Sequence, residues 1–102
     1  MYLSETFTMI NFKDLVDAII DVTLDPSQVN IYVQHGSIFP VVDYRLENNH
    51  LHLINFRSND FIEDVVNLEE LITYVAVEGF ELESVTLDSG DFEIIEDRIL
   101  LY

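Results

Sequence analysis

Two histidines separated by one residue, His50 and His52, are the side chains in this sequence best suited to binding a metal ion. On a β-strand, alternate side chains point to the same face, so both imidazoles would lie side by side. Glu47 and Asp43 precede them and supply carboxylate oxygens, which zinc accepts together with imidazole nitrogens. The expected strand pairing, however, places Arg45 opposite His52, and a fixed cation weakens metal binding. We therefore interpret this face as solvated and predict no metal site and no cofactor.

The segment DSGDFE at residues 88–93 has only a superficial likeness to a calcium-binding loop. Oxygen-bearing side chains close to a glycine suit a hard cation. An EF-hand loop, however, needs oxygen ligands at alternate positions before its glycine and a glutamate further along, and Leu87 and Asp91 do not supply them. We expect an ordinary turn here.

The sequence carries none of the residue patterns that mark a nucleophilic or phosphate-binding enzyme. Its serines lack the G-x-S-x-G and S-x-x-K contexts, its three glycines cannot form a phosphate-binding loop, and it has no cysteine. Pairs of carboxylates occur everywhere in a chain with 20 acidic residues, so they carry no catalytic signal. We predict no catalytic residues and a protein that is not an enzyme. A metal-dependent enzyme built on His50 and His52 is the least favoured alternative.

The overall composition favours one small folded domain. Of the 102 residues, 20 are acidic and four are Lys or Arg, which gives a net charge of −16, and 49% are hydrophobic. We therefore expect residues 1–102 to form a single acidic α+β domain. Four cations displace too few counterions for direct binding to DNA or RNA, and no apolar run approaches membrane-spanning length. The absence of cysteine and of a signal-peptide pattern favours the cytoplasm.

The negative charge is concentrated in the second half of the chain. Residues 1–57 contain seven acidic and three basic side chains, a net charge of −4, whereas residues 58–102 contain thirteen acidic side chains and Arg98 alone, a net charge of −12. Repulsion of this size destabilises a fold, so solubility alone is an insufficient reason for it. If these carboxylates gather over about a third of the surface, their spacing approaches that of DNA phosphates. A basic groove on a partner protein would offset the repulsion.

In its size, its charge, its lack of cysteine and its acid-rich residues 61–97, the chain resembles the small acidic proteins with which phages and mobile elements counter host defences. These include anti-restriction proteins and anti-CRISPR inhibitors of Cas nucleases. The resemblance implies a nucleic-acid mimic, a non-enzymatic inhibitor that occupies the groove in which a nuclease holds guide RNA or target DNA, in the host cytoplasm. Aromatic anchors would be Tyr74 or Tyr102. As partner-binding residues we select Glu69, Glu70, Glu81, Glu83, Asp91, Glu93, Glu96 and Asp97.

The alternative is a small phage or cellular protein that acts as an interaction or structural module. In that case an apolar patch or a sheet edge near residues 38–42 or 100–102 makes the contact, and the acidity serves solubility. Homodimerisation through such an edge would favour this alternative, and the sequence leaves the oligomeric state open.

Two amphipathic helices are expected. Residues 11–22 carry apolar side chains at helical spacing behind Asn11 as N-cap, and Asp25 followed by a proline ends the segment. A second helix is expected from about residue 67, with Asn67 as N-cap, Glu70 at the capping-box position and Gly79 after its end.

Six strands are expected, three before and three after the second helix. Residues 29–34 alternate between apolar and polar, and Pro40 is expected to start a strand or lie on a sheet edge. Residues 41–46 and 51–56 form a hairpin around Asn48 and Asn49. Residues 80–87, 92–95 and 98–102 form a meander with a bulge near Ser84. The prediction is an α+β fold, two helices packed on one face of a mainly antiparallel sheet, in the order α-β-β-β-α-β-β-β.

Overall fold

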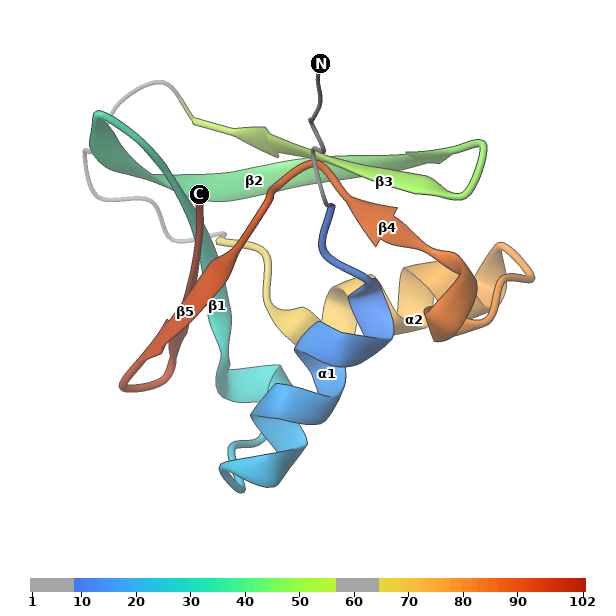
Figure 1. Cartoon of the computed structure of the whole chain (residues 1–102), viewed down its shortest axis with the longest axis horizontal. Helices are drawn as coiled ribbons and strands as arrows, with labels where there is room; N and C mark the ends of the chain where they lie inside the picture. Colours follow the sequence, from blue (N-terminus) through green and yellow to red (C-terminus); the bar gives the residue numbers. More distant parts are fainter. Residues whose placement is uncertain (1–8, 57–64) are drawn as a thin grey trace, which may run out of the picture.

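A computed structural model describes residues 9–56 and 65–102. Its elements are helices α1 (Phe12–Asp21) and α2 (Leu68–Val77), short 3-10 helices η1 (Pro26–Gln28) and η2 (Leu82–Ser84), and strands β1 (Asn30–His35), β2 (Ser37–Glu47), β3 (His50–Asn55), β4 (Thr86–Leu87), β5 (Phe92–Ile95) and β6 (Arg98–Leu101). The fold is α+β, with two helices and a six-stranded mixed sheet (Figure 1). Within the described ranges, neither α1 nor α2 has the length and apolar character needed to cross a lipid bilayer.

The sheet has the strand order β4-β3-β2-β1-β6-β5 and is mixed, so its predicted mainly antiparallel character is matched only in part. β1 pairs with β6 and β3 pairs with β4 in parallel, while the other three pairs are antiparallel. The predicted meander is wrong, because β4 lies beside β3 whereas β5 and β6 lie beyond β1 at the other end of the sheet. The hairpin of β5 and β6 is itself formed, with Ile94 opposite Ile99.

Residues 80–87 form a turn where a strand was predicted. They contain the 3-10 helix η2 followed by the two-residue strand β4, and not one strand with a bulge near Ser84. The backbone N–H and the hydroxyl of Ser84 both donate to the carbonyl of Glu81, at 3.0 and 2.8 Å. A serine that closes a turn in this way competes with strand pairing, which explains why the apolar alternation changes phase here.

The long strand β2 pairs with a different neighbour along each part of its length. Its residues 37–40 pair with β1 and its residues 41–47 pair with β3, with a bulge between Val41 and Asp43. Pro40 therefore lies inside a strand, contrary to the prediction. Its carbonyl accepts a hydrogen bond from the N–H of Phe56 at 2.8 Å, so its nitrogen faces the end of the β2–β3 ladder. Because the proline nitrogen does not face β1, its lack of a hydrogen costs no hydrogen bond between β1 and β2.

The hairpin between β2 and β3 is confirmed. Its turn residues Asn48 and Asn49 have φ of 52° and 65°, the left-handed conformation that a tight two-residue turn requires. Because Arg45 pairs with His52, the polar side chains of both strands share one face. The bulge makes Val41 a core residue. On the opposite face, Leu51 belongs to the core, and the side chains of Tyr44, Leu46 and Leu53 pack against it.

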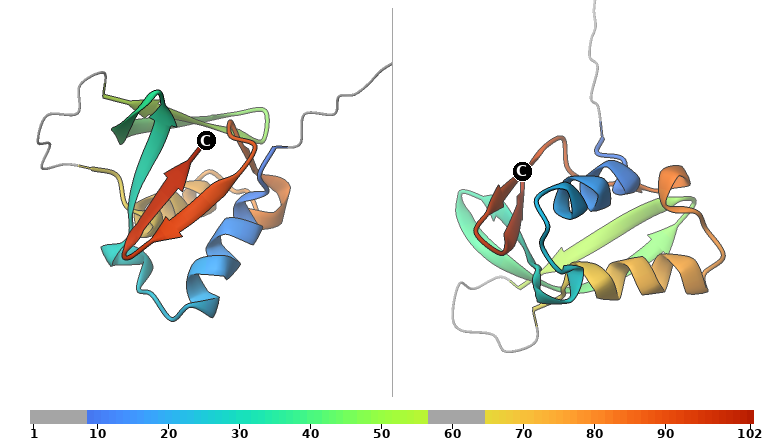
Figure 2. Two further views of the ribbon diagram at one scale, coloured as in Figure 1. Left: turned by 60° about the vertical axis from the view of Figure 1, so that its left-hand side comes forward. Right: turned by 90° about the horizontal axis from the view of Figure 1, so that it is seen from below.

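One hydrophobic core joins both helices to the sheet. Figures 1 and 2 show α1 and α2 within the curve formed by the long β2–β3 hairpin and by β1, β5 and β6. Both predicted N-caps are confirmed: the side chain of Asn11 accepts from the N–H of Lys13, and that of Asn67 accepts from the N–H of Glu70. The fully buried helix side chains are Phe12, Leu15, Ile19, Leu68, Leu71 and Val75.

Candidate interaction surface

The eight predicted partner-binding carboxylates are all exposed, but they fall into two groups. One group belongs to α2 and η2 and comprises Glu69, Glu70, Glu81 and Glu83. The other belongs to β5 and its flanking turns and comprises Asp91, Glu93, Glu96 and Asp97. Figures 1 and 2 place η2 and the turn between β5 and β6 at opposite ends of the molecule. The expected single patch is therefore not formed, because the last hairpin pairs with β1 and not with β4.

We call the first group, together with Glu78 at the end of α2, the acidic α2–η2 surface. It consists of Glu69, Glu70, Glu78, Glu81 and Glu83. At the rise of an α-helix, Glu70 and Glu78 are about 12 Å apart along the axis. Within the described part of the chain, none of these five carboxylates has a Lys or Arg nitrogen within 4.0 Å. The α1 cation Lys13 binds Asp17 instead, with Nζ and Oδ2 2.7 Å apart.

Glu81 and Glu83 are close enough to repel each other. A hydrogen bond between the two carboxyl groups, together with their mutual repulsion, raises the pKa of Glu81. A carboxyl group responds in this way when a like charge is close to it. A cationic side chain from a partner protein would remove this repulsion.

An open hollow of about 450 Å³ lies on the exposed side of α2, lined by Tyr44, Asn67, Glu69, Glu70, Thr73, Tyr74 and Val77. The rings of Tyr44 and Tyr74 meet edge to face, with centroids 4.8 Å apart. The Tyr44 hydroxyl donates to Oε2 of Glu70 at 2.8 Å, so this carboxylate turns towards the hollow. The Tyr74 hydroxyl accepts from the N–H of Leu46 at 3.0 Å. Both rings are thus held in place beside the first turn of α2.

This combination of rings and carboxylates suits the side chain of an arginine or a lysine. Aromatic faces attract cations, and a carboxylate binds a guanidinium group through two parallel hydrogen bonds. Burial, together with the hydrogen bond to Glu70, raises the pKa of Tyr44 to about 12, so its phenol remains a donor at neutral pH. Of the two predicted anchors, Tyr74 lines this hollow, whereas Tyr102 is 49% exposed beyond the end of β6.

The group on the β5–β6 hairpin differs because a cation lies beside it. Nε of Arg98 is 4.0 Å from Oδ1 of Asp97, and the guanidinium group lies over the ring of Tyr32, 5.9 Å from its centroid. Arg98 therefore offsets part of the negative charge at this end. The acidic α2–η2 surface is the stronger candidate for binding a basic partner.

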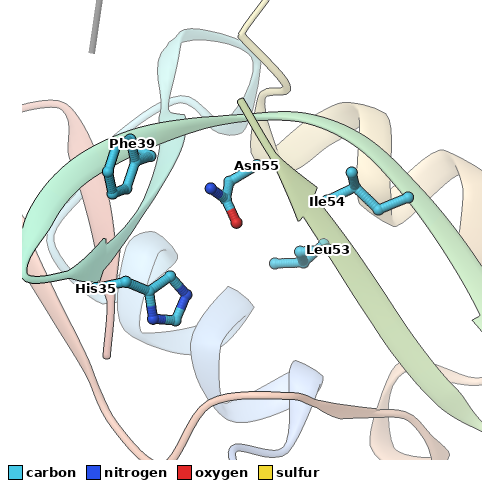
Figure 3. A pocket seen from close by; sticks show the side chains of 5 residues that line it. All are labelled: His35, Phe39, Leu53, Ile54 and Asn55. Carbon is cyan, nitrogen blue, oxygen red and sulfur yellow. The ribbon is translucent and has the colours of Figure 1, made fainter. Parts of the chain in front are cut away.

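A larger hollow of about 620 Å³ lies between the β1–β2 turn and β3 (Figure 3). His35, the last residue of β1, borders it together with Phe39, Leu53, Ile54 and Asn55. His35 is the only titratable group among the described residues that line it.

His50 and His52 are joined by Asp88, which the sequence analysis did not place beside them. The carboxylate of Asp88 contacts both imidazoles, whereas that of Asp43 accepts from the backbone N–H of Tyr44. Asp88 reaches the two histidines because it lies two residues after Thr86, just beyond the end of β4, and because β4 runs parallel to β3. The expected antiparallel meander concealed it, because in that arrangement β4 would have paired with β5.

Comparisons of the chain with protein-family models, with curated proteins and with solved structures found no match. The interpretation of its function therefore rests on the acidic α2–η2 surface and on the side-chain geometry described above.

Proposed function

We propose that this protein is a non-enzymatic, cytoplasmic inhibitor that binds the basic nucleic-acid-binding groove of another protein. Nucleases of the restriction or CRISPR type are the expected class of target. The acidic α2–η2 surface makes the main contact. The observation that supports this most strongly is that its five exposed carboxylates have no Lys or Arg nitrogen within 4.0 Å among the described residues, and that two of them, Glu69 and Glu70, line a hollow with two fixed tyrosine rings.

In this proposal the protein competes with nucleic acid through local charge and does not copy the outline of a duplex. A duplex carries a charge about every 1.7 Å along its axis, whereas the carboxylates described here fall into two groups, one on α2 and η2 and one on β5 and its flanking turns. A basic side chain of the partner enters the hollow beside Tyr44 and Tyr74 and pairs with Glu69 or Glu70. The carboxylates of Glu78, Glu81 and Glu83 contact further cations along the groove wall.

The test compares two triple variants that remove the same number of charges. The probe is a fluorescent peptide of consecutive arginines, and its binding is followed by fluorescence anisotropy at low salt. Glu69→Gln, Glu70→Gln and Glu81→Gln together should weaken binding about tenfold, because each exposed charge contact contributes about 0.5 kcal/mol. The matched control combines Glu93→Gln, Glu96→Gln and Asp97→Asn and should weaken binding less. Equal loss in both variants would show that net charge, and not this surface, determines binding.

An apolar contact is the second candidate. Ile38 and Ile95 are 47% and 40% exposed, and with Tyr32, Arg98 and Leu100 they line a small hollow of about 80 Å³. The sheet order leaves β4 and β5 as the edge strands, so the edges predicted near residues 38–42 and 100–102 belong to strands inside the sheet. If this patch is the interface, Ile38→Ser should abolish self-association measured by sedimentation while arginine-peptide binding is unchanged.

A further inference from the structure

Two neighbouring strands bring together three side chains that can bind a metal ion. His50 and His52 are alternate residues of β3 and so point to the same face of the sheet. β4 runs parallel to β3 with Thr86 paired to His50, and Asp88 follows two residues after Thr86 (Figure 1). This register carries the carboxylate of Asp88 along the same face to the two imidazoles.

The contacts within this cluster are close enough for one ion. Oδ1 of Asp88 is 2.5 Å from Nε2 of His50, and Oδ2 of Asp88 is 3.0 Å from Nδ1 of His52. One possible ligand atom from each residue lies within 4.8 Å of the other two. With bonds of about 2.0 to 2.2 Å, a tetrahedral zinc ion holds its ligand atoms about 3 to 4 Å apart, so small side-chain movements would complete the site.

The remaining ring nitrogens of both histidines have polar neighbours of their own. Nδ1 of His50 is 3.0 Å from the hydroxyl oxygen of Thr86, and Nε2 of His52 is 3.6 Å from Oε1 of Glu47. His50 is thus oriented as metal-binding histidines are, with an outer hydrogen-bond partner that fixes the ring while the other nitrogen faces the ion, whereas the contact of His52 with Glu47 is too long for a hydrogen bond. The arrangement leaves Nε2 of His50 and Nδ1 of His52 on the side of Asp88.

Backbone hydrogen bonds fix the strand that carries Asp88. The N–H of Thr86 donates to the carbonyl of Asn49 at 3.0 Å, and the N–H of Leu87 donates to the carbonyl of Ile10 at 2.9 Å. In return, the N–H of Ile10 donates to the carbonyl of Ser89 at 3.0 Å. β4 is thus held between β3 and the residues before α1. A site built on paired strands keeps its geometry better than one built on free loops.

We propose that His50, His52 and Asp88 bind a divalent transition-metal ion, with Zn²⁺ as the ion that fits best. Two imidazoles and one carboxylate are ligands for zinc, whereas Ca²⁺ and Mg²⁺ prefer oxygen alone. Three protein ligands leave one position open to water, and exposed fractions of 52% for the Asp88 side chain and 29% for that of His52 give the ion access.

Arg45 is the group that opposes binding, because it pairs with His52 across β2 and β3. The carboxylate of Glu47 beside His52 and the net charge of −16 both attract a cation and counter this effect. The sequence-based prediction of no metal site rested on this Arg45–His52 pairing. Asp88 supplies the third ligand. The site shares no residue with the acidic α2–η2 surface and goes beyond the proposed inhibitory function.

The first test is calorimetric titration of the untagged protein with Zn²⁺ in the presence of excess Mg²⁺, which occupies unspecific carboxylate sites. We expect one tight equivalent of Zn²⁺. His52→Ala and Asp88→Asn should each weaken this binding by more than about tenfold, and Thr86→Val, which removes only the outer partner of His50, by about tenfold. His35→Ala is the matched control and should bind as the original protein does. Equal affinity in the original protein and in the first two variants would overturn the proposal.

A second measurement needs no substitution and remains decisive if a variant fails to fold. Imidazole resonances of the original protein are followed by NMR during addition of less than one equivalent of Zn²⁺. The ring signals of His50 and His52 should change together while those of His35 stay in place. Unchanged signals of His50 and His52, or changes of equal size at all three histidines, would contradict a specific site.

Discussion

At the scale of single residues, Tyr44 provides the sharpest pH prediction. Burial and the hydrogen bond to Glu70 raise its pKa to about 12 from the usual value near 10, so the folded state holds the phenolic proton more tightly than the unfolded state. The stability that this provides is complete below about pH 10 and is lost as the pH rises through about 12. Ultraviolet titration should detect one tyrosine that ionises late, and Tyr44→Phe should remove that component alone. Loss of a different component would disprove the assignment.

The exposure of the acidic residues could be predicted from their type, because carboxylates are rarely buried without a partner. The contacts that these residues make could not be predicted in this way. Tyr44 and Glu70 are 26 positions apart in the chain, and His50 and Asp88 are 38 apart. Such contacts depend on which strands become neighbours, and local periodicity contains no information on that.

At the scale of elements, the helix caps give a testable stability prediction. The side chain of Asn67 accepts from the N–H of Glu70 at 2.9 Å and satisfies one of the free donors at the start of α2. Asn67→Ala should lower the free energy of unfolding by about 1 kcal/mol, whereas Asn67→Asp, an equally good cap, should change it little. Urea denaturation measures both. Equal losses in the two variants would show that something other than capping, such as packing around residue 67, determines the effect.

The helices and strands could be predicted where one face of the element is buried and where typical turn or cap residues mark its end. Helix α1, the Asn48–Asn49 hairpin and the β5–β6 hairpin meet both conditions. The prediction failed at residues 80–87, where apolar residues on two phases look like a bulged strand but arise from a 3-10 turn before a very short strand. It failed again at Pro40, whose missing N–H is tolerated because the β2–β3 ladder ends there.

At the scale of the whole molecule, the net charge of −16 should make stability depend on ionic strength. Salt screens the repulsion among exposed carboxylates, with a screening length of about 8 Å at physiological ionic strength. The thermal midpoint should therefore rise when sodium chloride is increased from low to physiological concentration. A midpoint that falls or stays constant would mean that the repulsion is already compensated within the fold.

The uneven charge along the chain was visible in the sequence, but its distribution in space was not. Parallel pairing of β1 with β6 moves the last hairpin away from α2 and divides the acidic residues between two ends. Parallel pairs join strands that are distant in the sequence, so no short turn between the two strands indicates that they pair.

The most direct test of the proposed inhibition is displacement of nucleic acid from a purified RNA-guided nuclease. A fluorescent single-stranded DNA or guide RNA is bound to the nuclease, the protein is added at low and at high salt, and release is measured. We predict release by the original protein at low salt, weaker release at high salt, and loss of release in the variant with Glu69→Gln, Glu70→Gln and Glu81→Gln but not in the charge-matched β5–β6 variant. Release that is independent of salt, or equal for the two variants, would contradict a contact made by the acidic α2–η2 surface.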